Sequence, residues 1–375
     1  MRKQLRRIRD TAKAIPWLAA VRLTKRPRGI LPKNLDGKRV LIIQWNAIGD
    51  ALMTTPLLGG LKRRFPDVLI DVLATHVNKS IFECQTTVES VLVLPNGGYR
   101  FWSAFRQQRL RPYDLIIDAT ADFRSACTTR VLRPISNRGF SRTVQAGAFK
   151  LDISRFYDDS HPYSEQHHIP SLVYSLGRPW LDSETPDRPT FNVPPEARHE
   201  AMDWFRAQAV DPQRAAILHP GAKWPPKRWP ESRWVSLAKA LLRAPNPRTP
   251  ILVGSDRDLP MLQRIATATG SGVKKIVGCD ISTLAAIVEA SSVAVCNDSF
   301  IMHLARALDK PAVALFGPVD PRRVTTEDGN MKILYQSPFC SPCQLYFHSQ
   351  RCWRGLNFCM HQIELRDVLA AVELC

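Results

Sequence analysis

Residues 297–321, NDSFIMHLARALDKPAVALFGPVDP, decide the fold class of this chain. An apolar strand is predicted to run into Asn297, Asp298 and Ser299, which are residue types that favour helix N-caps. An amphipathic helix follows, and then a second apolar run at residues 312–316. The order strand, helix, strand predicts a parallel unit whose helix N-terminus lies at the carboxyl edge of the sheet. Such an edge suits a bound diphosphate, and an ordinary helix cap in an α/β core is the alternative.

The amino-terminal half begins in the same way at residues 38–58, KRVLIIQWNAIGDALMTTPLL. Residues 40–43 are an apolar strand, Gly49 permits a tight turn, and Asp50 opens a helix. In the middle of the chain, AAILHPGAKWPPKRWPESRW at residues 215–234 predicts a strand followed by a basic loop. A basic loop at a strand end favours an acidic ligand.

Strand and helix signals alternate on both sides of a stretch that is rich in proline and acidic residues. The predicted fold class is therefore α/β, with an arm over residues 1–37, a doubly wound domain over 38–180, a linker over 181–198 and a second domain over 199–375. The expected strands are residues 40–43, 69–74, 91–94 and 115–117 in the first domain, and residues 215–218, 251–253, 275–277, 293–296 and 312–316 in the second.

Positive charge is concentrated near the amino end. The 375 residues hold 52 Lys and Arg against 34 Asp and Glu, a net charge of +18. Residues 1–33 contribute eleven Lys and Arg against the single Asp10, a local charge of +10 that leaves about +8 for everything else. No run of about 18 uncharged apolar residues is present, which predicts a cytoplasmic protein without a membrane span.

Apolar residues in this basic arm recur at helical spacing, at Leu5, Ile8, Ala12 and Ile15, before a short apolar run at residues 17–21. A basic amphipathic helix with a Trp beside it is typical of a segment lying on an anionic membrane leaflet, and removing such an arm should spare the core. A solvated, disordered tail and a nucleic-acid-binding arm are the alternatives. A secretory signal would need a longer apolar core and a cleavage site.

Five motifs occur in the order found in the heptosyltransferase family, glycosyltransferase family 9, which the chain resembles from residue 38 to about residue 372. They are AIGDALMTTPLL at residues 47–58, DLIIDATADFRS at 114–125, HPGAKWPPKRWP at 219–230, VGSDRD at 253–258, and the block at 297–321. A chance match of all five in order is hard to credit. The resemblance implies the GT-B fold, in which two Rossmann-like domains face each other across a ligand-binding cleft.

The resemblance also implies a catalytic base. Asp50 matches the position of the family's proposed base, which takes a proton from the acceptor hydroxyl in an inverting transfer. It is the only acidic residue in the first strand-to-helix turn. Capping of its own helix is the alternative role, because a carboxylate in a first turn also suits the helix dipole.

On the donor side, Lys227 matches the family's phosphate-contacting lysine, whose flexible stem can follow phosphate oxygens as the sugar bond lengthens. Lys223 and Arg228 are second choices. All three could be solvated loop charges, but Trp224 and Trp229 stand on either side of Lys227 and favour an ordered loop.

Three further residues match donor contacts of the family. Asp298 matches the acid near the donor sugar, and Ser299 with the amides after it would hold phosphate. Asp258 matches the acid near the nucleoside, where a carboxylate can accept hydrogen bonds from ribose hydroxyls, and an exposed loop acid is the alternative. Two positions depart from the family, Phe300 in place of the usual Gly and Gln44 in place of a common Arg, so the donor or acceptor could be a modified one.

Four of the nine cysteines cluster with the spacing C-x2-C-x8-C-x6-C: Cys340, Cys343, Cys352 and Cys359. In a reducing cytosol this spacing indicates either a structural zinc site or free buried thiols. For catalysis we expect no metal and no cofactor, because no paired acidic motif for a divalent ion is present. Lys227 and a helix dipole would supply the positive charge.

The function expected from the resemblance is inverting transfer of a heptose or related sugar from an ADP-sugar to the inner core of lipopolysaccharide. The expected partners are an ADP-heptose-like donor, a lipopolysaccharide-core acceptor and, through residues 1–33, the anionic membrane surface at the cytoplasmic face of the inner membrane. No nucleic-acid partner is expected. The alternatives are a non-catalytic membrane-associated scaffold, which Phe300 would favour, and a sugar-nucleotide epimerase of the same fold.

Overall fold

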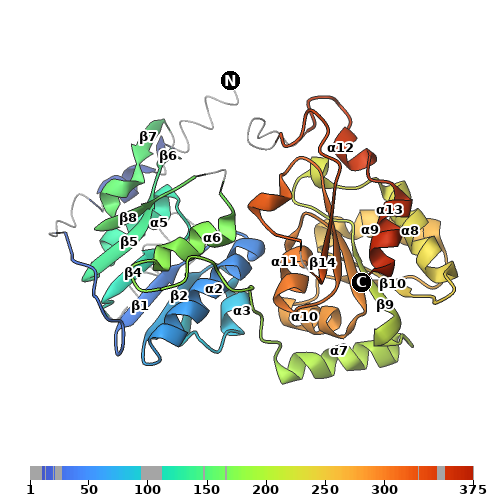
Figure 1. Ribbon diagram of the computed structural model, residues 1–375, viewed down its shortest axis with the longest axis horizontal. Coiled ribbons are helices and arrows are strands. Elements are labelled where there is room, and N and C mark those ends of the chain that lie inside the picture. Colours follow the sequence, from blue (N-terminus) through green and yellow to red (C-terminus); the bar gives the residue numbers. More distant parts are fainter. Residues whose placement is uncertain are drawn as a thin grey trace. The chain divides into compact units, whose positions relative to one another are not determined.

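The computed structural model describes residues 11–12, 14–19, 21, 28–93, 112–146, 148–164, 167–327, 329–343 and 351–374. The chain divides into two compact units, Met1–Asp187 and Arg188–Cys375, called here the first and second units (Figure 1). The division falls within residues 181–198, the stretch interpreted as a linker. Each unit is built on a six-stranded parallel sheet, so the expected α/β class with two Rossmann-like domains is confirmed.

The sheet of the first unit has the strand order β3-β2-β1-β4-β5-β8. Its strands are β1 (Arg39–Ile43), β2 (Leu69–Ala74), β3 (Ser90–Val93), β4 (Leu115–Asp118), β5 (Ser136–Ser141) and β8 (Asp159–Pro162). Its helices are α2 (Ile48–Arg64), α3 (Lys79–Glu83), α5 (Phe123–Val131) and α6 (Ile169–Tyr174), and β6 (Thr143–Ala146) pairs with β7 (Phe149–Asp152) in a separate hairpin. The central strands β1 and β4 are almost wholly buried, as expected for parallel strands covered on both faces.

The sheet of the second unit has the order β11-β10-β9-β12-β13-β14. Its strands are β9 (Ala215–His219), β10 (Thr249–Gly254), β11 (Lys274–Val277), β12 (Val293–Asn297), β13 (Ala312–Phe316) and β14 (Met331–Tyr335). Helices α8 (Glu231–Arg243), α9 (Leu259–Thr269) and α13 (Leu365–Glu373) cover one face, and α10 (Ile281–Ala290) and α11 (Phe300–Ala307) cover the other (Figure 1). The remaining helices are α7 (Pro195–Ala207) and the short α12 (Phe358–His361).

Both sheets reverse their strand order at one point, between β1 and β4 in the first unit and between β9 and β12 in the second. In doubly wound sheets, ligands bind outside the carboxyl ends of the strands at such a switch point. The loops that follow β1, β4, β9 and β12 are therefore the places to look for a site, and they carry most of the residues singled out from the sequence.

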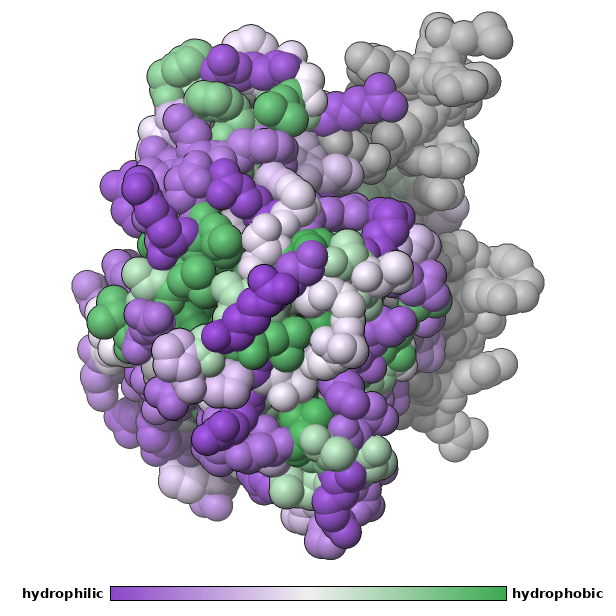
Figure 2. All heavy atoms as spheres, turned by 90° about the vertical axis from the view of Figure 1, so that its right-hand side faces the viewer, coloured by the Kyte–Doolittle hydropathy of each residue, from purple (hydrophilic) through white to green (hydrophobic). Residues whose placement is uncertain are grey.

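One core cluster of the second unit lies between the sheet and helices α8, α9 and α13. Two tryptophans anchor it, Trp229 and Trp234, whose rings meet edge to face at 5.3 Å. On the face of this unit seen in Figure 2, hydrophilic residues are widespread and apolar residues form separate small areas. Most of the large apolar side chains that the structure describes in this unit are buried.

The described part of the amino-terminal arm packs into the first unit. Residues 11–12, 14–19 and 21 are helical, and Trp17 is only 4% exposed, packed in a core cluster with residues of α5 and of the segment after β7. Ile15, by contrast, is 56% exposed. The expectation that residues 1–33 could be removed without loss to the core is wrong on this point, because Trp17, which was expected on a membrane surface, lies in the domain interior. Leu5 and Ile8 lie outside the described residues.

Among the residues that the structure describes, no helix has the length and apolar character needed to cross a membrane.

Candidate active site

Asn297, the last residue of β12, fixes the basic loop of the second unit. Its side-chain amide donates to the carbonyl oxygens of Pro220 (2.8 Å) and Gly221 (3.3 Å), and its oxygen accepts from the backbone N–H of Trp229 (3.0 Å). Asn297 is fully buried, so each of these hydrogen bonds satisfies a group that water cannot reach. The sequence predicted Asn297 as one of three candidate caps, but the N-cap of α11 is Ser299.

Lys227 and Asp298 form an ion pair at this switch point. The Lys227 Nζ lies 2.7 Å from an oxygen of Asp298, and the two side chains are 16% and 8% exposed. The ammonium group also lies 5.3 Å from the centre of the Trp224 ring. The structure therefore brings together the predicted phosphate ligand and the predicted acid near the donor sugar, from positions 71 residues apart (298 − 227).

The other tryptophan of the loop points away from Lys227. Trp229 is buried in the core and donates from its indole nitrogen to the carbonyl of Ile363 at 3.0 Å. Of the two tryptophans expected around Lys227, Trp224 supplies the aromatic contact, and Trp229 anchors the loop to the domain.

Asp258 lies against the ends of two strands. Its carboxylate accepts from the Ser255 amide (3.1 Å) and hydroxyl (2.7 Å), and the Arg228 Nη2 lies 3.7 Å from it. A Cβ added at Gly221 or Gly254 would come within 3.1 Å or 2.9 Å of Asp258 atoms, so both glycines leave the room that this side chain occupies. At 13% exposure Asp258 is not the exposed loop acid of the alternative interpretation.

The two other cations of the loop differ. Arg228 donates from Nε (3.2 Å) and Nη2 (2.9 Å) to the carbonyl of Ala222, which holds the guanidinium in the loop near Asp258. Lys223 is exposed and makes no ion pair among the residues that the structure describes. Among the described residues, Lys223 is thus the one predicted donor ligand that lies outside the cluster formed by Lys227, Arg228, Asp258, Asp298 and Ser299.

Ser299 and Phe300 meet a buried histidine. The Ser299 hydroxyl lies 3.1 Å from His219 Nδ1, and the Phe300 ring packs edge to face against the imidazole at 5.5 Å. Burial lowers the pKa of His219 to about 4, so the ring is neutral at physiological pH. Phe300, which replaces the family's usual Gly, therefore packs against a neutral side chain of the site.

His303 is a site residue that the sequence interpretation missed. It lies on α11 one turn after Ser299, is buried, and has its pKa lowered to about 4, first by burial. The Asp298 carboxylate opposes this shift, and Lys227 reinforces it, which places His303 within electrostatic reach of the ion pair. Its only sequence signal is the four-residue spacing from Ser299.

In the first unit, Asp50 is the third residue of α2, and its carboxylate accepts from the Ala47 amide at 3.1 Å. The capping role is therefore present, and it leaves the role of base open because a carboxylate has several acceptor positions. Gln44 is buried and donates to the Thr54 hydroxyl (3.0 Å) and the Ala119 carbonyl (3.3 Å). The residue that replaces a common Arg thus ties β1 to its neighbours without adding charge.

The four clustered cysteines line one pocket of the second unit together with Trp224, Pro318 and Phe358. All four are free thiols, and burial raises the pKa of Cys359 to about 12. Within the described ranges, no group of three or more His, Cys, Asp or Glu side chains is arranged to hold a metal ion.

Residues 100–353, more than half of the chain, match the sequence model of glycosyltransferase family 9 (heptosyltransferase). The chain belongs to glycosyltransferase family 9. The family and the enzyme class expected from the five motifs are thereby confirmed.

Relatives of this family 9 glycosyltransferase cover most of its length. A lipooligosaccharide heptosyltransferase 2 of Haemophilus influenzae is 26% identical over 299 residues, which cover 76% of this chain and 84% of the relative. A lipopolysaccharide heptosyltransferase 1 of Pseudomonas aeruginosa is 27% identical over 320 residues, covering 81% and 86%. The structure of the Escherichia coli heptosyltransferase WaaC with ADP matches with a TM-score of 0.64 and 23% identity over 89% of this chain and 97% of that one, which supports the GT-B fold.

Proposed function

We propose that this glycosyltransferase transfers a heptose from ADP-heptose to the core of lipopolysaccharide, with inversion at the anomeric carbon. The observation that carries the proposal is the buried Lys227–Asp298 pair at the switch point of the second sheet, beside the N-terminus of α11. Relatives named as heptosyltransferases, and one solved with ADP, support this choice of sugar and nucleotide.

The second unit would hold the donor. Lys227 would contact the diphosphate and stabilise the charge that develops as ADP leaves, together with the amides at the start of α11. Asp298 would keep the ammonium group in place and lie near the sugar. Asp258, with Arg228 beside it, would accept hydrogen bonds from the ribose hydroxyls. We propose no metal or cofactor for this step, because Lys227 supplies positive charge and the sequence lacks a paired acidic motif.

The first unit would supply the base. In this proposal Asp50 takes the proton of the acceptor hydroxyl while the acceptor oxygen forms a bond to the anomeric carbon. The bond from that carbon to the diphosphate breaks, and ADP leaves with the electron pair. The Ala47 amide orients the Asp50 carboxylate in the turn after β1.

We also propose that the enzyme works at the cytoplasmic face of the inner membrane. The +10 charge of residues 1–33 supports this, since each Lys or Arg near an anionic surface is worth on the order of 1 kcal/mol. Because Trp17 is buried, the attraction would rest on charge more than on an inserted aromatic side chain. Binding to anionic vesicles should then fall steeply as salt rises, whereas salt-independent binding would contradict it.

ADP release from purified enzyme tests the reaction. With ADP-heptose, ADP should appear only when a heptose-deficient lipopolysaccharide core is added, and the core should gain one heptose by mass spectrometry. A scaffold would release no ADP with any donor, and an epimerase would change the donor sugar without an acceptor. Neither alternative is favoured by the relatives, which are named as heptosyltransferases.

A further inference from the structure

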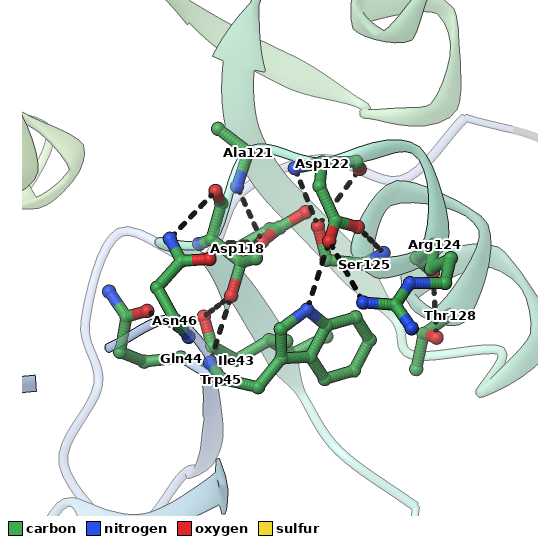
Figure 3. Close-up of polar contacts among 11 residues, drawn as sticks. Ile43, Gln44, Trp45, Asn46, Asp118, Ala121, Asp122, Arg124, Ser125 and Thr128 are labelled. Atoms are coloured by element: carbon green, nitrogen blue, oxygen red, sulfur yellow. Dashed lines mark hydrogen bonds and ion pairs between the residues drawn. The ribbon is translucent and has the colours of Figure 1, made fainter. Parts of the chain in front are cut away.

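Three side chains gather where β1 and β4 of the first sheet end. The indole nitrogen of Trp45 donates to an oxygen of Asp122 at 3.1 Å, and the Arg124 Nη2 lies 3.6 Å from the same oxygen. The guanidinium carbon of Arg124 is 5.8 Å from the centre of the Trp45 ring. Figure 3 shows this group beside Gln44 and Asn46, in the loop that follows β1. The reaction proposed above assigns none of the three a role.

A network of buried hydrogen bonds holds these three side chains in place. The Trp45 amide donates to the Thr120 hydroxyl at 3.1 Å, and the buried Asp118 accepts from the Thr120 amide (2.9 Å) and the Tyr157 hydroxyl (2.6 Å). Asp122 also caps α5 by accepting from the Ser125 amide at 2.8 Å. Side chains fixed in this way lose little conformational entropy when a ligand binds, which is the condition for a preorganised site.

The chemistry that remains available points to one kind of ligand. Arg124 is 42% exposed, and among the described residues its guanidinium contacts only Asp122 and the Trp45 ring. It therefore keeps N–H donors for a planar anion such as a carboxylate or for a phosphate. The indole of Trp45 is half-buried and packs against a core cluster of the first unit, and its nitrogen already has an acceptor. Its ring therefore fixes the position of the Arg124 guanidinium that lies over it.

We propose that Arg124 binds the acceptor, with its guanidinium paired with a carboxylate or phosphate on the saccharide. Trp45 and Asp122 are positioning residues that hold this guanidinium in place. The site lies at the strand ends where ligands of doubly wound sheets bind, and Trp45 is five residues before the proposed base Asp50. The inference rests on the proposed transferase function and adds a recognition site for an anionic acceptor.

Kinetics on matched variants test the site. Arg124→Ala and Trp45→Ala should each raise the KM for a soluble, heptose-deficient core oligosaccharide about tenfold or more, with a smaller effect on kcat and on the donor KM. Arg124→Lys should recover part of the loss, and Trp45→Phe guards against misfolding of the alanine variant. The control is Arg64→Ala, because Arg64 also has an aspartate partner (Asp182, 3.8 Å) and a nearby ring (Phe65, 5.3 Å) but ends α2 at the opposite edge of the sheet.

The nature of the anion is decided with three forms of the oligosaccharide: native, methyl-esterified at its carboxylates, and treated with phosphatase. Wild type should lose affinity for the form that lacks the recognised anion, and Arg124→Ala should no longer distinguish that form from the native one. Unchanged acceptor KM in both alanine variants overturns the inference. If wild type releases no ADP with any form, the proposed function fails, and calorimetric titration of the oligosaccharide decides instead: an equal Kd for wild type and Arg124→Ala then overturns the inference.

Discussion

The ammonium nitrogen of Lys227 lies 2.7 Å from a carboxylate oxygen of Asp298, with both side chains largely buried. Neither charge could be kept at this depth alone, because an unpaired buried ion is strongly destabilising. The pair therefore places a positive charge at the N-terminus of α11 in advance of any ligand. A diphosphate arriving there would find the lysine oriented and the backbone amides of the helix nearby.

The first prediction compares the two lysines of the loop. Lys227→Ala should lower kcat/KM by about a hundredfold, the scale of losing one preorganised charge contact to the leaving group. Lys223→Ala should have a much smaller effect, because Lys223 is exposed and outside the cluster. Steady-state kinetics on both purified variants decide the matter, and equal effects would mean that the loop acts as a diffuse basic surface.

The second prediction separates the two roles of Asp50. Asp50→Asn keeps an oxygen that can accept from the Ala47 amide but removes the base, so turnover should fall about a hundredfold or more while the unfolding midpoint changes little. Asp50→Ala should lose turnover to a similar extent and about 1 kcal/mol of stability as well. Near-normal turnover of a folded Asp50→Asn enzyme would reduce Asp50 to a helix cap.

A third prediction concerns Asn297 and the loop it holds. Asn297→Ala removes partners from the carbonyls of Pro220 and Gly221 and from the Trp229 amide, so the free energy of unfolding should fall by about 3 kcal/mol or more. Asn330→Ala is the control, because the hydrogen bond of that amide to Asp309 is exposed to solvent and its loss should cost less than about 1 kcal/mol. Urea denaturation measures both losses. Equal losses would show that the buried hydrogen bonds of Asn297 contribute no more to the free energy of unfolding than the exposed one of Asn330.

The fourth prediction is a pH dependence of stability in the second unit. His219 and His303 have folded-state pKa values of about 4, below the usual 6.5. Their contribution to the free energy of unfolding is fully present above pH 6.5. It is lost as pH falls toward 4, because in that range only the unfolded chain binds the protons. Each should cost roughly 2 kcal/mol on going from pH 7 to pH 5.

Asp118 in the first unit contributes a pH dependence of stability of the opposite sign. Burial raises its pKa to about 7, so its effect destabilises the fold as pH rises from about 4 toward 7.

Hydrogen exchange, measured on individual peptides, can resolve the two units. Protection of second-unit peptides should fall between pH 7 and pH 5 after correction for intrinsic exchange, and His303→Gln should reduce that fall. An unchanged pH slope in His303→Gln would contradict the assignment.

The fifth prediction tests the buried start of the chain. Trp17→Ala should destabilise the protein by about 3 to 5 kcal/mol, since Trp17 lies inside a core cluster. Ile15→Ala, two residues earlier and exposed, should change stability by no more than about 0.5 kcal/mol. Thermal and urea denaturation provide the comparison. A Trp17→Ala protein as stable as wild type would mean that the helix is only loosely docked.

Most strands with an apolar sequence could be predicted, although the apolar β14 (MKILY) was missed, and the polar strands β5 and β8 could not be predicted. Residues 69–74 and 312–316 were placed with their bounds correct, and the other seven expected strands were found within one or two residues. Strands β5, β8 and β14 were not expected. The sequences of β5 and β8, SNRGFS and DSHP, lack an apolar run, and these strands are stabilised by partners such as the paired Arg138 and Asp159, which only the sheet register brings together.

The candidate site shows the same limit. Family motifs gave roles to Lys227 and Asp298, but their contact depends on how β9 and β12 lie side by side, which no local pattern specifies. His303 was missed because it lies on the apolar side of its helix. Only its burial near the ion pair of Lys227 and Asp298 identifies it as a site residue. Trp45 and Asp122 were likewise separated by 77 positions and are joined by one hydrogen bond.

The docking of the amino-terminal helix has a consequence for how the protein is made. The Thr11 hydroxyl accepts from the amide of Ala148, and Trp17 packs against residues near Tyr157 in the same cluster. At roughly 5 to 20 residues per second, a ribosome needs on the order of ten seconds to add the 137 positions between Thr11 and Ala148. Throughout that interval the contact of Thr11 with Ala148 cannot form, so the amino-terminal helix can complete its docking only after most of the first domain has been synthesised.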